Sequence, residues 1–228
     1  MIFEEIYTHL SDSIGKKEKV QIIGVTGNMG AGKSHFCREF ASFLNTCDVY
    51  AVHWDQDWYQ VSRTERDRII TQLRSQNITD PIELSRRTYF DTYLWDEMCA
   101  HITLMKRRES ILASTVYNKG TGNRDLNVEL SFPEQNKPTW IVYDGGFIMH
   151  EPIRSLMDCM IVVEANADNR FERMAKRALN LARPYKLEPA RFKELDTFTS
   201  WYLEKYRAPT DIILANDNFT HPKILFPK

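Results

Sequence analysis

The sequence predicts an α/β fold, in which a parallel β-sheet is flanked by helices on both faces. Three features of the 228-residue chain support this prediction. Short apolar runs typical of buried strands alternate with longer segments in which apolar residues recur at helical spacing. The first apolar run leads directly into a glycine-rich loop. The length suits one well-packed domain and is too small for two with a linker, so we expect a single domain over residues 1–228.

The expected strands are short apolar runs bounded by polar or turn-forming segments. These runs occupy residues 20–25, 48–53, 111–117, 140–144, 159–164 and 211–214. The polar segment 118–138 is rich in Gly, Asn and Pro, and we expect it to be a functional loop.

The expected helices are segments whose apolar residues share one face. In the segment 94–105 apolar residues lie three or four positions apart, which would line one side of a helix. The segment 62–87 is charged, and the Asp-Pro pair at 80–81 should divide it into separate helical pieces. The remaining helical segments are 2–14, a stretch that begins near Lys33, 151–157, 168–181 and 189–206.

Residues 27–34 follow the first predicted strand and fit the pattern G-x-x-x-x-G-K-[ST] of a phosphate-binding P-loop. A strand followed by such a loop and a helix lets successive backbone N–H groups surround a phosphate at the positive end of the helix dipole. Lys33 would neutralise charge on the β- and γ-phosphates, and the Ser34 hydroxyl would coordinate Mg²⁺. The sequence therefore predicts a P-loop NTPase fold. The predicted phosphate-binding residues are Gly27, Asn28, Met29, Gly30, Ala31, Gly32, Lys33 and Ser34.

Composition and charge restrict the partners of the chain. The formal net charge is −1, so no overall field would recruit nucleic acid or an anionic membrane. The four cysteines show no metal-binding spacing, and we interpret them as reduced thiols, as in a cytoplasmic protein. The N-terminus is acidic, unlike a signal peptide, and no apolar run is long enough to span a bilayer. We expect a small-molecule partner, and the sequence leaves homo-oligomer formation open.

Acidic residues follow two predicted strands at the edge where parallel sheets bind ligands. Asp144 has the position of an Mg²⁺ ligand, although an aspartate before Gly-Gly also suits a simple turn. Asp55 and Asp57 come just after the strand at 48–53. A carboxylate there would accept the proton of a hydroxyl that attacks a γ-phosphate. The alternative for this pair is a solvated acidic turn.

Taken together, these motifs resemble those of the uridine kinase and phosphoribulokinase group. The resemblance rests on the run 22–34, on the aspartate and aromatic pair after the second strand, and on Asp-Gly-Gly-Phe at 144–147. It extends through Arg-x-x-Arg at 170–173 to residues 206–213 and so spans nearly the whole chain. It implies a nucleoside-kinase-like P-loop fold with a mobile, arginine-bearing lid at about 168–190, and ATP with Mg²⁺ as cofactors.

The resemblance makes an acid after the second strand the catalytic base, and its position stays open. Counted back from the aromatic pair at 58–59, the spacing of uridine kinases falls on Gln56, whereas that of pantothenate kinases falls on Asp55. Asp57 lies one step from Gln56. We predict Asp55 first and Asp57 second, with Lys33 as the remaining catalytic residue.

The same resemblance assigns residues to the acceptor. Tyr117 and Arg124 match a tyrosine and an arginine seven positions apart in the uridine kinase nucleoside site. The histidine that uridine kinases place against the pyrimidine falls at Gly122. Asp91 matches the position that holds the ribose hydroxyls. The string that contains Lys119 also resembles a segment of plant-type glycerate kinases, which use a different acceptor.

Three arginines follow the strand at 159–164, in the lid position of such kinases. Arg170, Arg173 and Arg177 are three and seven positions apart and would share one helical face. A basic helical face is usually just solvated. Here the resemblance implies that the guanidinium groups bind phosphate, to which they can donate bidentate hydrogen bonds.

These observations predict an Mg²⁺-dependent kinase that transfers the γ-phosphoryl group of ATP to a hydroxyl of a small metabolite, with uridine or cytidine as the first acceptor. A glycerate kinase-like or other metabolite kinase is the alternative within this class. Outside it, a non-catalytic nucleotide-binding module stays open. The sequence argues against a GTPase, because Asn118-Lys119 is followed by Gly120 and Thr121 and so does not complete the N-K-x-D motif.

Overall fold

The computed structural model describes residues 2–14, 20–133, 137–180, 186–207, 210–218 and 221–225. In this part of the chain a six-stranded sheet has the order β2-β5-β1-β6-β7-β8. All neighbouring strands are parallel except β7 and β8. The predicted α/β fold is confirmed. The strands are β1 (Val20–Gly27), β2 (Tyr50–Asp55), β5 (Thr139–Asp144), β6 (Cys159–Glu164), β7 (Ile212–Ala215) and β8 (Lys223–Leu225).

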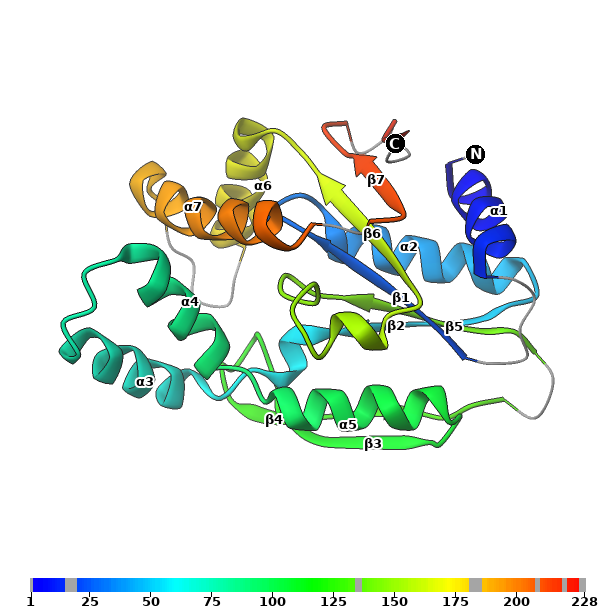
Figure 1. The fold of residues 1–228 in the computed structure, drawn as a ribbon, viewed down its shortest axis with the longest axis horizontal. Coiled ribbons are helices and arrows are strands. Elements are labelled where there is room, and N and C mark those ends of the chain that lie inside the picture. The colour runs from blue at the N-terminus through cyan, green and yellow to red at the C-terminus, as the bar shows by residue number, and fades with distance from the viewer. Residues whose placement is uncertain are drawn as a thin grey trace.

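Helices cover both faces of the sheet (Figure 1). Side chains alternate along a strand, so Ile22 and Ile23 of β1 enter different hydrophobic clusters. The cluster with Ile23 packs against α1 and α2, whereas the one with Ile22 packs against α5 and α7. The helices are α1 (Ile2–Ile14), α2 (Lys33–Thr46), α3 (Arg63–Ser75), α4 (Pro81–Asp91), α5 (Trp95–Lys106), α6 (Ala167–Leu179) and α7 (Pro189–Tyr206).

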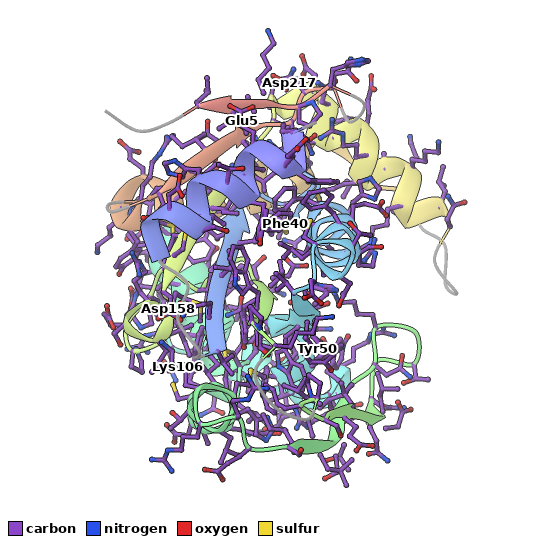
Figure 2. All side chains as sticks on the ribbon, turned by 90° about the vertical axis from the view of Figure 1, so that its right-hand side faces the viewer. Glu5, Phe40, Tyr50, Lys106, Asp158 and Asp217 are labelled. Atoms are coloured by element: carbon purple, nitrogen blue, oxygen red, sulfur yellow. The ribbon has the colours of Figure 1, made fainter. Side chains whose placement is uncertain are left out.

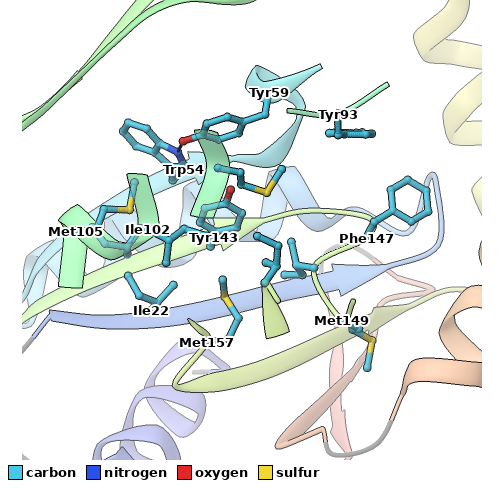
Figure 3. Packing of buried hydrophobic residues seen from close by; sticks show 14 of the residues in the cluster. Ile22, Trp54, Tyr59, Tyr93, Ile102, Met105, Tyr143, Phe147, Met149 and Met157 are labelled. Carbon is cyan, nitrogen blue, oxygen red and sulfur yellow. Dashed lines mark hydrogen bonds between the residues drawn. The ribbon is translucent and has the colours of Figure 1, made fainter. Parts of the chain in front are cut away.

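A buried chain of polar groups fixes the turn that follows β2. Trp54 Nε1 donates to the Tyr59 hydroxyl at 2.9 Å (Figure 3), and that hydroxyl lies 2.9 Å from His101 Nδ1. Because Trp54 and Tyr59 are fully buried, their polar atoms need such partners. These hydrogen bonds hold the 3₁₀ turn η1 (Gln56–Tyr59) against α5. The turn η1 carries Asp57, one of the candidate catalytic acids.

An ion pair anchors α5 at the opposite end of the sheet. Lys106 Nζ lies 3.0 Å from Asp158 Oδ1, and Asp158 Oδ2 accepts a hydrogen bond from the Ile22 N–H at 2.8 Å (Figure 2). On the other face, Phe40 of α2 packs beside Phe3 of α1 with ring centroids 5.8 Å apart. The Asp158 contacts thus tie α5 to β1, and the ring contact joins α1 to α2.

The structure corrects the prediction for residues 111–138. β3 (Ile111–Tyr117) is a strand, as predicted, but it pairs with β4 (Arg124–Leu130) in a separate antiparallel sheet. β4 lies inside the segment that we expected to be a loop. Most side chains of β4 are exposed, so the strand lacks the apolar run by which buried strands are recognised.

Smaller differences concern element ends. β2 runs from Tyr50 to Asp55, later than the predicted 48–53, and β8 was not predicted. The predicted helix at 151–157 is a series of turns that includes η2 (Arg154–Leu156). The segment 62–87 is helical in pieces, as predicted, and the Asp80 side chain caps α4 by accepting from the Ile82 N–H. None of the helices among the described residues has the length and apolar character that crossing a membrane requires.

Candidate active site

The sheet brings the P-loop and two carboxylates together at the carboxyl ends of β1, β2 and β5. Asp144, the last residue of β5, is the register partner of Val25 on β1 and of Asp55 on β2. β1 ends two residues later, at Gly27. A Cβ at Gly27 would lie 2.0 Å from the Val163 carbonyl oxygen, and φ is 147°. Glycine is therefore required where β1 turns into the loop.

Lys33 is the first residue of α2, and its ammonium group closes the P-loop. Nζ donates to the carbonyl oxygens of Gly27 at 3.0 Å and Asn28 at 3.1 Å. Burial lowers the pKa of Lys33, and the negative charge of Asp144 opposes that shift. Phosphate oxygens form stronger, charge-assisted hydrogen bonds than carbonyl groups do. A bound triphosphate would thus draw Lys33 away from the carbonyls. The predicted loop residues 27–34 all lie in this turn and the start of α2.

The two candidate bases lie under one lysine from the β3–β4 turn. Lys119 Nζ is 2.8 Å from Asp55 Oδ2 and 2.9 Å from Asp57 Oδ2. Asp57 also accepts hydrogen bonds from Gln60 Nε2 and the Tyr93 hydroxyl, each at 2.8 Å. Asp57 is therefore fixed by more donors than Asp55.

The two carboxylates differ in basicity. Burial, together with the negative charge of Asp57, raises the pKa of Asp55 to about 6. Burial acts in the same direction on Asp57, but the Lys119 charge and the hydrogen bonds from Lys119 and Tyr93 outweigh it and lower the pKa of Asp57. A general base works best with a pKa near the working pH, so the environment favours Asp55 over Asp57.

Gln56 binds the loop that follows Asp144. Its Oε1 accepts a hydrogen bond from the Phe147 N–H at 3.0 Å, and the residue is fully buried. The amide therefore holds the loop after β5 to the turn after β2. This contact explains why the residue that the uridine kinase spacing selects need not be an acid here.

Asp144 and Ser34 are suitable ligands for Mg²⁺. Asp144 is buried, and no lysine or arginine of the described chain lies within ion-pair distance of it. Its nearest ion-pair contact is His53 Nε2, at 3.5 Å. A buried carboxylate of this kind is stabilised by a cation, and hydroxyl and carboxylate oxygens are the donors that Mg²⁺ prefers. Cys37, His53 and Asp144 also offer ligand atoms within 4.8 Å of one another, a set that suits softer metals.

The predicted acceptor residues do not all come together. Tyr117 and Lys119 lie on the hairpin side of the site. Arg124 donates to the Gln60 carbonyl at 3.0 Å and to Glu97 at 3.1 Å, so it attaches the hairpin to η1 and α5. Asp91 is exposed at the end of α4 and makes no hydrogen bond or ion pair with the described residues.

Two of the three predicted lid arginines have protein partners in this structure. Arg170 forms an ion pair with Asp196 of α7. Arg173 donates to the Asn216 carbonyl at 2.7 Å and to the Gly30 carbonyl at 3.4 Å. Arg177 is exposed. Phosphate binding by these residues stays a prediction. Residues 181–185 of the predicted lid lie outside the described residues.

Sequence reasoning missed Tyr93, which donates a hydrogen bond to Asp57, and Asp196, which pairs with Arg170. Asp196 accepts from Asn28 Nδ2 of the P-loop at 3.2 Å as well as from Arg170. These contacts join residues that are 36 and 168 positions apart. No local pattern in the sequence could have indicated them.

Comparison with known proteins identifies the family of this chain. A family model described as "Phosphoribulokinase / Uridine kinase family" matches residues 22–188, more than half of the chain. A uridine kinase from Leuconostoc citreum is 25% identical over 163 residues, which cover 71% of this chain and 70% of the relative.

Solved structures share the fold. D-glycerate 3-kinase from Cryptococcus neoformans aligns with a TM-score of 0.67 at 11% identity, covering 99% of each chain. Phosphoribulokinase from Rhodobacter spheroides aligns with a TM-score of 0.59 at 15% identity, covering 87% of this chain and 71% of that one. The predicted P-loop kinase fold is confirmed.

Proposed function

The chain belongs to the phosphoribulokinase / uridine kinase family, and on that premise we propose that it transfers the γ-phosphoryl group of ATP to a hydroxyl of a small metabolite. The observation that carries this proposal is the convergence of Lys33, Asp55 and Asp144. Phosphoryl transfer requires a phosphate-binding lysine, a carboxylate of raised pKa that can accept a proton, and a buried carboxylate suited to Mg²⁺.

The proposed roles follow from the contacts of each side chain. Backbone N–H groups of the P-loop and Lys33 bind the phosphates. Ser34 and Asp144 would hold Mg²⁺, which would supply positive charge to offset the negative charge of the phosphates. Asp55 accepts the proton of the acceptor hydroxyl, whose oxygen bonds to the γ-phosphorus. The bond from that phosphorus to the bridging oxygen breaks, and ADP leaves.

A pocket beside the P-loop suits the nucleoside part of ATP. It has a volume of about 330 Å³ and lies at the carboxyl ends of β6 and β7. Asn28 of the P-loop contributes to its wall, which joins it to the phosphate site. The lining residues are Asn28, Glu164, Ala165, Asn166, Ala215 and Asp217. In this arrangement the arginines of α6 would face the phosphates from the lid, with Arg170 leaving Asp196.

The acceptor has two candidate classes. A nucleoside such as uridine is supported by the uridine kinase relative. A glycerate-like acceptor is supported by the resemblance of the segment around Lys119 to glycerate kinases and by the glycine at position 122, where a pyrimidine-binding histidine is missing.

The test is a screen of ADP formation with uridine, cytidine, purine nucleosides, D-glycerate and pantothenate as acceptors. We expect acceptor-dependent ADP formation that requires Mg²⁺ and is lost in Lys33→Ala. ATP binding without ADP formation for any acceptor would support a nucleotide-binding module in place of a kinase.

A further inference from the structure

Two arginines of α3 lack carboxylate partners beside the proposed acceptor site. The half-buried guanidinium of Arg63 makes no hydrogen bond or ion pair with the described residues. Arg66 donates to the neutral groups Gln60 Oε1 at 2.7 Å and Tyr117 OH at 3.2 Å. By contrast, Arg68 on the same helix is exposed and forms an ion pair with Glu65 at 2.6 Å.

The Arg63 guanidinium lies where a side chain at position 122 would be. A Cβ on Gly122 would be 2.7 Å from Arg63 Cζ, and the φ of 78° itself favours glycine. The backbone is fixed at the same point, because the Arg63 N–H donates to the Gly122 carbonyl at 2.8 Å. A cation therefore takes the place at which the resemblance to uridine kinases expects a histidine.

Short series of contacts connect both arginines to the residues around Asp55 and Asp57. Gly122 lies in the same turn as Lys119, which pairs with Asp55. Arg66 is joined to Asp57 through Gln60, whose amide accepts from the guanidinium at 2.7 Å and donates to Asp57 at 2.8 Å. The two arginines thus belong to the same network of contacts as Lys119 and the two aspartates.

The charged groups of this region leave positive charge that an anion could neutralise. Lys119 is paired with the two aspartates, and Arg124 is paired with Glu97. Arg63 and Arg66 are the half-buried cations of this region that have no carboxylate partner among the described residues. Guanidinium groups bind carboxylate and phosphate through paired, charge-assisted hydrogen bonds.

We propose that the acceptor carries an anionic group, a carboxylate or a phosphate, which binds Arg63 and Arg66 while the acceptor hydroxyl reaches Asp55. Arg63 is then a specificity-determining residue. This inference rests on the proposed phosphotransferase function.

The first experiment compares acceptors that differ in charge. D-glycerate and glycerol 3-phosphate distinguish carboxylate from phosphate, and glycerol and uridine serve as neutral acceptors. We expect one anionic acceptor to exceed both neutral acceptors at least about tenfold in kcat/KM. Arg63→Gln should raise its KM about 10- to 100-fold and leave the KM for ATP unchanged. Arg68→Gln is the matched control and should change neither value. The proposal would be overturned if neutral and anionic acceptors had equal kcat/KM. It would also be overturned if Arg63→Gln raised the KM of every acceptor by the same factor.

The second experiment requires no turnover. In Lys33→Ala, which weakens anion binding at the P-loop, D-glycerate or inorganic phosphate should raise the Tm by about 2 °C or more. Arg63→Gln in that background should abolish the shift, with circular dichroism confirming the fold. An unchanged shift, or no shift in Lys33→Ala itself, contradicts the anion site. Absence of phosphorylation with a retained Arg63-dependent shift would contradict the proposed kinase function and leave the anion site supported.

Discussion

Lys119 Nζ lies 2.8 Å from Asp55 Oδ2, and this ion pair joins residues that are 64 positions apart. Burial by itself lowers the pKa of Lys119, but Asp57 and Asp55 raise it well above its usual value. Lys119 therefore stays charged over the physiological range and stabilises the ionised form of Asp55. The lysine of the hairpin turn thus lowers the pKa of the proposed base, against the larger effects of burial and of the Asp57 charge, which raise it.

Removing Lys119 should shift the pH dependence of the reaction. Asp55 must be ionised to accept a proton, so kcat/KM should fall as the pH decreases through about 6. Because Lys119 lowers the pKa of Asp55, Lys119→Met should move this acid limb to higher pH. The measurement is the pH profile of kcat/KM. Lys106→Met, which removes the pair with Asp158 at the other end of the sheet, should leave the limb in place. If the fall of kcat/KM at low pH occurs at the same pH in Lys119→Met, a group other than Asp55 is responsible for it.

Substitution of the two acids should separate their roles. Asp55→Asn should lower kcat about 100-fold or more, the scale of general-base catalysis, with little change in the affinity for ATP. Asp57→Asn should be milder, because Asp57 has the lower pKa and already accepts from Gln60 and Tyr93. Steady-state kinetics on the acceptor found in the screen tests both variants. If Asp57→Asn is the more damaging, the base is Asp57.

Lys33→Ala should abolish phosphorylation without unfolding the protein. Its ammonium group donates hydrogen bonds to two loop carbonyls, so the substitution mainly removes positive charge beside the bound phosphates. Turnover and circular dichroism should be measured together. A folded variant with the activity of the unchanged protein would refute the proposed role of the P-loop.

Glycine should be required at position 122 and not at position 146. Gly122→Ala introduces a Cβ at positive φ against Arg63, which should cost about 1–3 kcal/mol of stability. At Gly146 an added Cβ meets no atom within 4 Å, so Gly146→Ala should change the free energy of unfolding by less than about 0.5 kcal/mol. Urea denaturation of both variants makes the comparison. Equal stability of the two variants would mean that the turn relaxes freely.

Arg124→Ala should weaken binding of the acceptor, because it removes the contacts that hold the β3–β4 hairpin in position. Its guanidinium is bound to Glu97 and to the Gln60 carbonyl, so its loss frees the turn that carries Lys119. We expect a larger rise in the KM of the acceptor than in that of ATP, together with a loss of about 1–3 kcal/mol in stability. Arg107→Ala removes an exposed pair with Glu109 and is the control. A stable variant with an unchanged acceptor KM would contradict this role.

The strands of the sheet and the P-loop could be predicted because their signals are local. β1, β5 and β6 are buried along almost their whole length, so each is a continuous apolar run. The hairpin strand β4 could not be predicted in the same way. Its exposed side chains leave no apolar run in a segment rich in Gly and Asn.

The sequence alone determined the fold class, the family resemblance and the set of candidate acids, since spacing along the chain specifies a P-loop and the residues at strand ends. It left the base open between Asp55 and Asp57, because the uridine kinase spacing falls on Gln56. Only the tertiary structure turned Gln56 toward Phe147 and placed Lys119 over both aspartates. It also brought Arg63 to Gly122. A pKa depends on burial and on charges within a few ångströms, and those neighbours come from segments that are far apart in the chain.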